Sequence, residues 1–157
     1  MNLTRYESPL GSILLAADQT GLTGLWFVGQ KYFPSFLDGD FFENETPVLT
    51  EAKHWLSLYF SGKEPDFLPP LHPQGSFFRQ AVWNVLLTIP RGQTMTYGEI
   101  ARRLNVRSAQ AVGGAVGHNP ISILIPCHRV VGSDGSLTGY AGGLARKEWL
   151  LHLEGAR

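Results

Sequence analysis

The sequence contains a single cysteine, Cys127, so no disulfide can form within the chain. No run of about 18 uncharged apolar residues occurs, which excludes a membrane-spanning helix. Residues 1–10 lack the basic and then apolar pattern of a secretory signal. A free thiol without such a signal favours a reducing compartment, and we therefore expect a cytoplasmic protein.

Motifs for metals and cofactors are also missing. The five histidines and the one cysteine show no zinc-ligand spacing. The glycines form neither a phosphate-binding loop nor a dinucleotide fingerprint. We therefore expect no metal and no cofactor.

The chain has no formal net charge, but its two halves differ. Residues 1–75 sum to −5 and residues 76–157 sum to +5. Such asymmetry is typical of a chain whose second half binds a polyanion. A chance imbalance between two small domains explains it equally well.

Turns and apolar spacing predict a short sheet and a helix in the first half. Residues 29–46 show no clear period and are predicted to be loop. Four prolines between Pro65 and Pro73 predict an extended linker, so we expect domains at 1–75 and 76–157. The predicted strands are Leu3–Glu7, Ser12–Ala17 and Leu22–Val28, and the predicted helix is Val48–Phe60.

The second half is predicted to be mainly helical. Ser76 is expected to cap a helix that Pro90 stops, and Thr96 and Glu99 fit a capping box in which each side chain satisfies the other's backbone donor. Helix, short turn and helix in a basic segment resemble a helix-turn-helix. The first helix has an apolar stripe of Phe78, Val82, Val85, Leu86 and Ile89. Later helices are predicted over Tyr97–Leu104, Ser108–His118 and Ala145–Leu153, the last burying Trp149, Leu150 and Leu153.

Three glycines lie within the segment Ala109–Gly117, and each costs a helix about 1 kcal/mol relative to alanine. Small residues permit another backbone to come close, and in a basic helix-turn-helix that backbone can be DNA. Tight packing against a neighbouring helix or strand is the other explanation. Spacing alone favours packing slightly and leaves both open.

Cys127 lies in the most informative stretch. The apolar run Ile121–Ile125 precedes it as an expected buried strand, and prolines fix the backbone at both ends of that run. His128 and Arg129 follow, and both can favour a thiolate. A lone intracellular cysteine is often a small buried hydrophobe, but this setting favours a reactive thiol.

The product of thiolate attack would determine the class of protein. Attack on a carbonyl forms a thioester, which a hydrolase must then resolve with water. Attack on a saturated alkyl carbon forms a thioether, which water does not cleave, so the protein acts once. The basic helix-turn-helix favours a nucleic-acid substrate and hence dealkylation of a base.

Motifs across the second half, from Phe78 to Gly155, resemble the O6-alkylguanine-DNA alkyltransferases. They are Pro-Cys-His-Arg-Val at 126–130, Tyr97 after a threonine, Ala-Val-Gly-Gly at 111–114, Gly-Tyr-Ala-Gly-Gly at 139–143 and Lys-Glu-Trp-Leu-Leu at 147–151. The first half matches only loosely, chiefly in Ser-Pro-Leu-Gly at 8–11. The resemblance implies an α/β (α+β) protein, with a small ribonuclease-H-like sheet-plus-helix domain followed by a winged helix-turn-helix domain.

The same resemblance implies direct DNA repair, with chemical roles for five residues. Cys127 would accept the alkyl group in a single turnover, while His128, through a water, and Glu154 draw away the thiol proton. Asn119 would hold the cysteine loop in place. Tyr97 would protonate guanine N3 and press on a DNA phosphate. Adjacent residues on an extended strand point to opposite faces, which supports the water-bridged relay.

The resemblance further implies a monomer that binds double-stranded DNA carrying O6-alkylguanine, and also O4-alkylthymine, through the minor groove. The damaged nucleotide would be flipped out of the duplex. Ser108–Gly117 would be the recognition helix. The DNA- and base-binding positions would be Thr96, Arg107, Ala109, Gln110, Gly114, Arg129, Val130, Ser133, Tyr140 and Ala141.

Gln110 departs from the family pattern, which usually has an arginine that enters the duplex and fills the space left by the flipped base. Glutamine can still hydrogen-bond the orphaned cytosine, but it has no charge and less stacking surface. We expect weaker DNA binding or slower repair as a result. There are two alternatives. The first is a lesion sensor that does not repair, although proteins of that class lack the acceptor cysteine. The second is a cysteine hydrolase, for which no oxyanion site is apparent.

Overall fold

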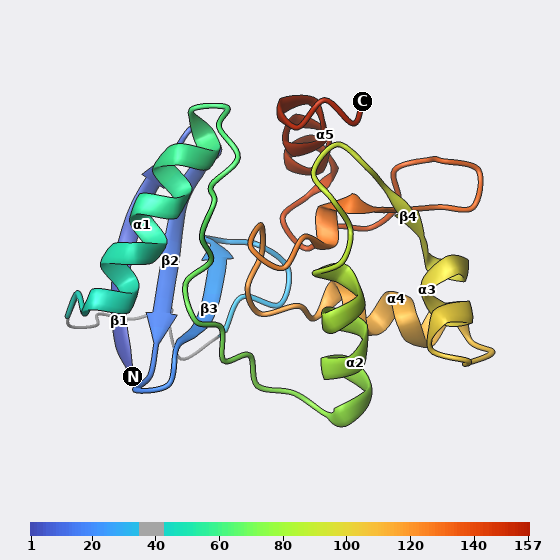
Figure 1. The fold of residues 1–157 in the computed structure, drawn as a ribbon, viewed down its shortest axis with the longest axis horizontal. Coiled ribbons are helices and arrows are strands. Elements are labelled where there is room, and N and C mark those ends of the chain that lie inside the picture. The colour runs from blue at the N-terminus through green and yellow to red at the C-terminus, as the bar shows by residue number, and fades with distance from the viewer. Residues whose placement is uncertain (35–42) are drawn as a thin grey trace. The chain divides into compact units, whose positions relative to one another are not determined.

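The computed structural model describes residues 1–34 and 43–157 and divides the chain into two units, Met1–Gln74 and Gly75–Arg157. In the first unit a helix covers one face of a three-stranded antiparallel sheet (Figure 1). The elements are β1 (Asn2–Ser8), β2 (Gly11–Ala17), β3 (Leu22–Phe27) and α1 (Pro47–Phe60). The strand order β1-β2-β3 confirms the predicted meander.

Local side-chain contacts explain the first turn and the helix. The Ser8 hydroxyl donates to the Gly11 carbonyl at 2.7 Å and accepts from the Leu10 amide at 3.0 Å. Gly11 has a φ of 107°, which glycine adopts without a steric penalty. The α1 residues that face the sheet are buried at helical spacing, namely Leu49, Ala52, Trp55, Leu56 and Tyr59.

The predicted loop and linker of the first unit need one correction. Within the predicted loop 29–46, residues 35–42 lie outside the described residues, and no helix or strand occurs in the rest. The end of the predicted linker is not a free spacer: the Pro70 carbonyl accepts from the Leu22 amide at 2.8 Å, and His72 donates to the Leu22 carbonyl at 2.7 Å. Proline lacks an N–H but keeps its carbonyl, so this proline-rich segment still pairs with β3.

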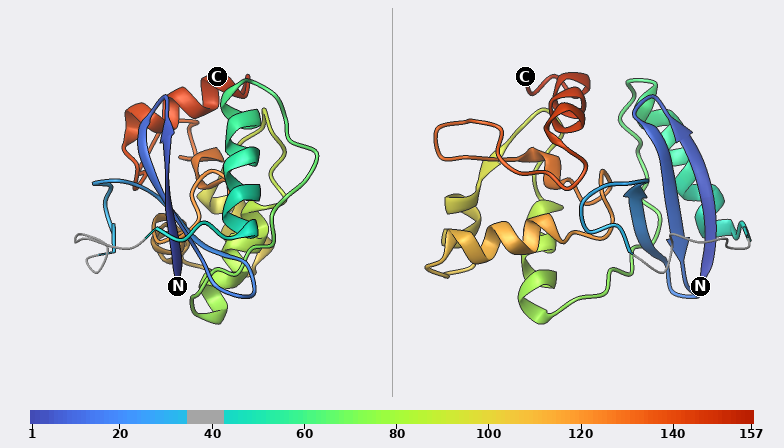
Figure 2. Two further views of the ribbon diagram at one scale, coloured as in Figure 1. Left: turned by 90° about the vertical axis from the view of Figure 1, so that its left-hand side faces the viewer. Right: turned by 180° about the vertical axis from the view of Figure 1, so that it is seen from behind.

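The second unit contains the predicted helix-turn-helix. Helices α2, α3 and α4 pack on one another, as Figure 2 shows from two further sides. A parallel pair of two-residue strands joins the segment before α3 to the segment after Cys127. The elements are α2 (Phe77–Leu86), β4 (Met95–Thr96), α3 (Tyr97–Arg103), α4 (Ala109–Gly117), the 3-10 turn η2 (Cys127–Arg129), β5 (Val130–Val131) and α5 (Leu144–Leu153). In the described part of the chain, no helix is long and apolar enough to span a membrane.

The α2 helix begins as predicted but ends earlier. The Ser76 hydroxyl accepts from the Arg79 amide, which confirms the cap, whereas regular helix stops at Leu86 and turns occupy the residues before Pro90. The predicted apolar stripe also omits Trp83, which is buried and donates from its indole nitrogen to the Ala115 carbonyl at 2.8 Å. This bond ties α2 to α4.

The cap of α3 differs in one bond from the predicted capping box. The Thr96 hydroxyl accepts from the Glu99 amide at 3.1 Å, as expected. The Glu99 carboxylate, however, accepts from the Thr96 hydroxyl at 3.2 Å, and no bond from it to the Thr96 amide is found. The backbone of Thr96 instead belongs to β4, which pairs with β5.

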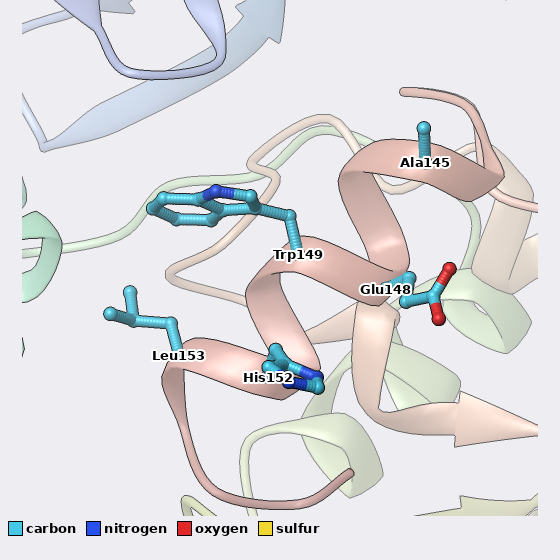
Figure 3. A pocket seen from close by; sticks show the side chains of 5 residues that line it. All are labelled: Ala145, Glu148, Trp149, His152 and Leu153. Atoms are coloured by element: carbon cyan, nitrogen blue, oxygen red, sulfur yellow. The ribbon is translucent and has the colours of Figure 1, made fainter.

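Helix α5 has two opposite faces. Its buried face carries Lys147, Leu150 and Leu151, and Glu154 continues this face at the C-cap. The other face lines a surface pocket with Ala145, Glu148, Trp149, His152 and Leu153 (Figure 3). Only Leu150 of the three predicted core residues is therefore buried, because Trp149 and Leu153 project from the pocket face and are only half-buried.

Candidate active site

Cys127 follows a tight turn rather than the predicted strand. The run Ile121–Ile125 is buried as expected, but Ile123 has a φ of 70°, in the left-handed region that β-branched residues rarely adopt. Asn119 supports this turn at both ends. Its amide nitrogen donates to the Ile125 carbonyl at 2.8 Å and its oxygen accepts from the Ile121 amide at 3.0 Å. The loop-holding role of Asn119 stays a prediction, and these two bonds are the contacts that it would use.

The Cys127 thiol begins η2 and is only 5% exposed. Burial raises its pKa, while a hydrogen bond from Asn119 and the charge of Lys147 act to lower that pKa. The sequence pattern predicted that His128 and Arg129 would favour the thiolate. In the structure both of those side chains bond to Glu154, so Lys147 is the cation that acts on the sulfur.

His128 is fully buried and oriented by Glu154. Its Nε2 lies 2.8 Å from Glu154 Oε2, so Nε2 carries the proton and donates it to the carboxylate. Burial lowers the pKa of His128, although Glu154 acts to raise it, and the ring is neutral at pH 7. Its Nδ1 is buried and has no hydrogen-bond partner among the described residues. The ring therefore presents a lone pair that can accept a proton.

Arg129 completes a buried ionic cluster. Its Nε donates to Glu154 Oε1 at 2.8 Å and one terminal nitrogen donates to Oε2 at 3.0 Å, while the other donates to the Ile89 carbonyl at 2.6 Å. Glu154 caps the C-terminus of α5, where the helix dipole disfavours an anion, and Arg129 offsets that cost. The DNA contact predicted for Arg129 stays a prediction, and in the structure its guanidinium is bonded to Glu154 and to the Ile89 carbonyl.

Lys147 is the site residue that sequence reasoning missed. Its side chain has no exposed surface, and its ammonium donates to the Thr138 carbonyl at 2.8 Å and the Gly139 carbonyl at 3.3 Å. Burial lowers the pKa of Lys147 to about 8, while Cys127 acts to raise it. Lys147 shares a helical face with Glu154, and a charged residue among apolar ones on that face was the available signal.

Tyr97 reaches the same backbone turn from α3. It is the first residue of that helix, and its hydroxyl donates to the Thr138 carbonyl at 3.3 Å. Thr96 is occupied as the N-cap of α3. Tyr140 and Ala141 lie in the following turn, where the Gly143 amide donates to the Tyr140 carbonyl at 2.8 Å.

The remaining predicted DNA-binding residues are placed separately from this cluster. Val130 is buried in β5, whereas Ser133 is exposed in the loop after it. The others are exposed on or just before α4, and they are Arg107, Ala109, Gln110 and Gly114. The structure thus pairs His128 with Glu154 and Asn119 with Cys127, brings Tyr97 to the Thr138 carbonyl that Lys147 also binds, and leaves the α4 residues exposed.

Two of the α4 glycines, Gly113 and Gly114, are not required by tight packing within the protein, whereas spacing slightly favoured packing. A Cβ added at Gly114 would meet nothing within 4 Å, and one at Gly113 would make ordinary contact with the Tyr97 ring at 3.8 Å. Ser108 caps the helix by accepting from the Ala111 amide at 3.0 Å. The face of α4 that carries Gly114 is therefore open to an external partner.

Comparisons with known proteins match both units. The family described as 6-O-methylguanine DNA methyltransferase, ribonuclease-like domain, matches residues 1–73, and its DNA binding domain matches residues 77–156. The methylated-DNA--protein-cysteine methyltransferase of Methanosarcina acetivorans is 47% identical over 96% of both chains. That of Haemophilus influenzae is 43% identical over 96% of this chain and 84% of its own.

A solved structure agrees with these matches. Mycobacterium tuberculosis OGT in complex with DNA superposes with a TM-score of 0.87 at 40% identity, covering 99% of this chain and 94% of that chain. The family match over residues 77–156 includes α4, α5 and residues 119–129, which carry Cys127 and are called the acceptor turn below. The chain belongs to the 6-O-methylguanine DNA methyltransferase family.

Proposed function

We propose that this protein repairs alkylated DNA directly, by transferring the alkyl group of O6-alkylguanine once and irreversibly to Cys127. One observation carries the proposal: a buried thiol is followed directly by a buried imidazole whose Nε2 bonds Glu154 and whose Nδ1 has no partner among the described residues. This arrangement can accept a proton from the thiol without exposing the site to solvent. The relatives named methylated-DNA--protein-cysteine methyltransferase support the same activity.

The residues of the site can account for the proton, the electron pair and the leaving group of the transfer step. The Cys127 S–H bond breaks, and its proton passes through a bridging water to His128 Nδ1, forming an imidazolium stabilised by Glu154. The sulfur electron pair forms a bond to the alkyl carbon. The bond from that carbon to guanine O6 breaks, and its electrons stay with the purine. Tyr97 donates its hydroxyl proton to guanine N3, so no anion is expelled.

After the transfer, His128 and Tyr97 return to their starting protonation states, but Cys127 stays alkylated and cannot react again. His128 returns its proton to solvent and Tyr97 regains one, so the net products are a thioether on Cys127 and an unmodified guanine. Water does not cleave a thioether, and therefore each protein acts once. The same chemistry applies to O4-alkylthymine, which also carries an alkyl group on a base oxygen.

Recognition of DNA is assigned to the exposed face of α4. Its small residues can press into the minor groove, which is narrower than the major groove. The target nucleotide must leave the stack, at a cost of a few kcal/mol. Gln110 would take the vacated space, and Tyr140 and Ala141 would line the base pocket beside Val130. The protein is proposed to act as a monomer in the cytoplasm.

Intact-mass measurement on a duplex containing O6-methylguanine tests this function. We expect a gain of one methyl group that never exceeds one per protein and that disappears in Cys127→Ser. Tight binding of the lesion with unchanged mass would instead identify a damage sensor, an outcome that the uncharged Gln110 keeps open. Repeated turnover, with more guanine repaired than protein present, would contradict the single-use mechanism and identify a hydrolase.

A further inference from the structure

The buried face of α5 carries opposite charges on either side of the acceptor turn. Lys147, Leu150, Leu151 and Glu154 follow the spacing i, i+3, i+4 and i+7, so they share one helical face. This face packs on η2. With a rise of about 1.5 Å per residue, the two charged positions are about 10 Å apart along the helix. The Glu154 carboxylate accepts hydrogen bonds from His128 and Arg129, the two residues after the cysteine, and Lys147 has different partners.

Lys147 is costly to bury and must have specific partners. A buried ammonium without hydrogen bonds or an opposite charge is strongly unfavourable. Two of its three N–H donors are taken by the carbonyls of Thr138 and Gly139. Neither carbonyl has a full charge. The positive charge also interacts with Cys127 on the neighbouring η2: it acts to lower the pKa of the thiol, and the thiolate acts to raise the pKa of Lys147.

The Thr138 carbonyl is shared by two helices. It accepts from Lys147 of α5 at 2.8 Å and from the Tyr97 hydroxyl of α3 at 3.3 Å. A carbonyl oxygen has two lone pairs, so both bonds can be present together. Gly139, with a φ of 41°, continues this turn, and its carbonyl accepts a second bond from Lys147. The ammonium thus fixes the backbone atom against which the Tyr97 hydroxyl is held.

We propose that Lys147 is a positioning residue that stabilises the Cys127 thiolate and, through the same ammonium, fixes the Thr138 carbonyl that orients the Tyr97 hydroxyl. This inference rests on the transfer reaction proposed above. Lys147 touches neither DNA nor the alkyl group in this scheme. It acts on both protein groups of the step, because it stabilises the nucleophile Cys127 and orients the proton donor Tyr97.

The charges around Cys127 make Lys147 the only cation among the described residues that can serve the sulfur in this way. Arg129 is neutralised by Glu154, and His128 is neutral and bonded to the same carboxylate. Arg157 acts on Lys147, lowering its pKa, and its own terminal nitrogen donates to the Gly135 carbonyl. Once Cys127 carries an alkyl group, the sulfur is neutral and Lys147 loses its anionic partner.

Alkylation of Cys127 by iodoacetamide, followed by intact mass across a pH series, tests the first half of this role without DNA. In Lys147→Met, which keeps the length of the stem, we expect the midpoint of the pH–rate profile to rise by about one pH unit or more. Lys63→Met in the first unit should leave the profile unchanged, because Lys63 is exposed in a different unit. An unchanged midpoint in a folded Lys147→Met protein would overturn the proposal.

A second measurement keeps Lys147 in place, in case its replacement prevents folding. Carbon-13 NMR of lysine side chains should show Lys147 titrating near pH 8 in the unmodified protein. In Cys127→Ala its midpoint should move to lower pH, because coupling between two charges is reciprocal. An unshifted Lys147 would rule out the pairing with sulfur.

Single-turnover transfer from an O6-methylguanine duplex tests the second half. The comparison is made at a pH where Cys127 is deprotonated in both the unmodified protein and Lys147→Met. There the substitution should lower the rate of methyl transfer more than the rate of iodoacetamide alkylation, because it also misplaces Tyr97. Equal losses in both assays would remove the Tyr97 part of the proposal. An unmodified protein that takes no methyl group would refute the proposed function, while its iodoacetamide profile would still report on Lys147.

Discussion

The acceptor turn and the outer face of α4 are built in opposite ways. Around Cys127 the polar side chains are buried or largely buried and bonded to one another, and Glu154 accepts from both His128 and Arg129. Along α4, by contrast, Ala109, Gln110 and Gly114 are exposed, and an added Cβ at Gly114 would meet nothing. The first region is complete within the chain, whereas the second is shaped for something that approaches from outside.

This difference shows where each kind of variant should act. Changes in the acceptor cluster should alter the stability of the protein and the chemistry of the thiol together, because the same buried contacts serve both. Changes on the α4 face should leave folding nearly intact and act on DNA binding.

Removing the Glu154 carboxylate should have the largest effect on stability. In Glu154→Leu the Arg129 guanidinium stays buried without its anion, so we expect a loss of about 3–5 kcal/mol in the free energy of unfolding, measured in urea. Glu148→Leu on the pocket face of the same helix is the matched control, with a change within about 0.5 kcal/mol. Equal effects of the two variants would mean that the buried cluster does not support the fold.

A second substitution can sharpen this result. Arg129→Met together with Glu154→Leu removes both charges, so no buried ion is left unpaired. We expect the double variant to regain part of the stability lost in Glu154→Leu. If it is as unstable as the sum of the single losses, then the two side chains contribute independently.

A leucine at Gly114 should separate folding from binding. An added Cβ at Gly114 meets nothing within 4 Å and the position is exposed, so we expect the helix to gain up to about 1 kcal/mol in unfolding free energy because leucine has the higher helix propensity. DNA affinity should fall by at least about tenfold, or 1.4 kcal/mol, because the side chain occupies the surface reserved for the groove. The control is again Glu148→Leu, which places the same side chain on α5. Unchanged affinity for a duplex would contradict the close approach of DNA to α4.

Acid should weaken the fold through His128. Burial keeps its folded pKa below 6.5, so below that pH the unfolded chain binds a proton that the folded protein excludes. The contribution of neutral His128 to the free energy of unfolding is therefore fully present above pH 6.5. It is lost as the pH falls toward the pKa of His128 in the folded protein, by at most about 1.4 kcal/mol per pH unit. His128→Gln, which can still donate to Glu154, should show a shallower loss between pH 7 and pH 5. An equally steep loss would assign the acid sensitivity to other groups.

The sequence predicted local structure better than it predicted contacts. The meander and the capped helices were predicted because alternation, turn residues and caps act between near neighbours in the chain. The Ser108 cap of α4, by contrast, was not predicted and is seen only in the structure. In α5 the apolar residues occur on both faces, so spacing could not show that Trp149 faces a pocket and Leu150 the interior.

The predicted site was limited in the same way. The prolines, the apolar run and the basic neighbours of Cys127 indicated a reactive thiol, but the partners of a charge depend on residues far along the chain. Arg129 bonds a carboxylate 25 residues away, and its place in the motif does not reveal this pairing. Lys147 is a charged position on an apolar helical face, but this pattern does not show which backbone carbonyls it binds. The left-handed Ile123 was likewise hidden, since its residue type favours a strand.

Gln110→Arg should produce the smallest change and the most informative one. The position is exposed near the start of α4, so the fold should tolerate arginine with a change in unfolding free energy within about 0.5 kcal/mol. A cation that enters the duplex should tighten DNA binding, and if it also meets a phosphate the salt dependence should steepen by about 0.9. Single-turnover transfer should then become faster, because the flipped state is held longer. If affinity and transfer rate both stay the same, glutamine already fills the vacated space as well as arginine can, and the opening of the duplex does not limit the reaction at Cys127.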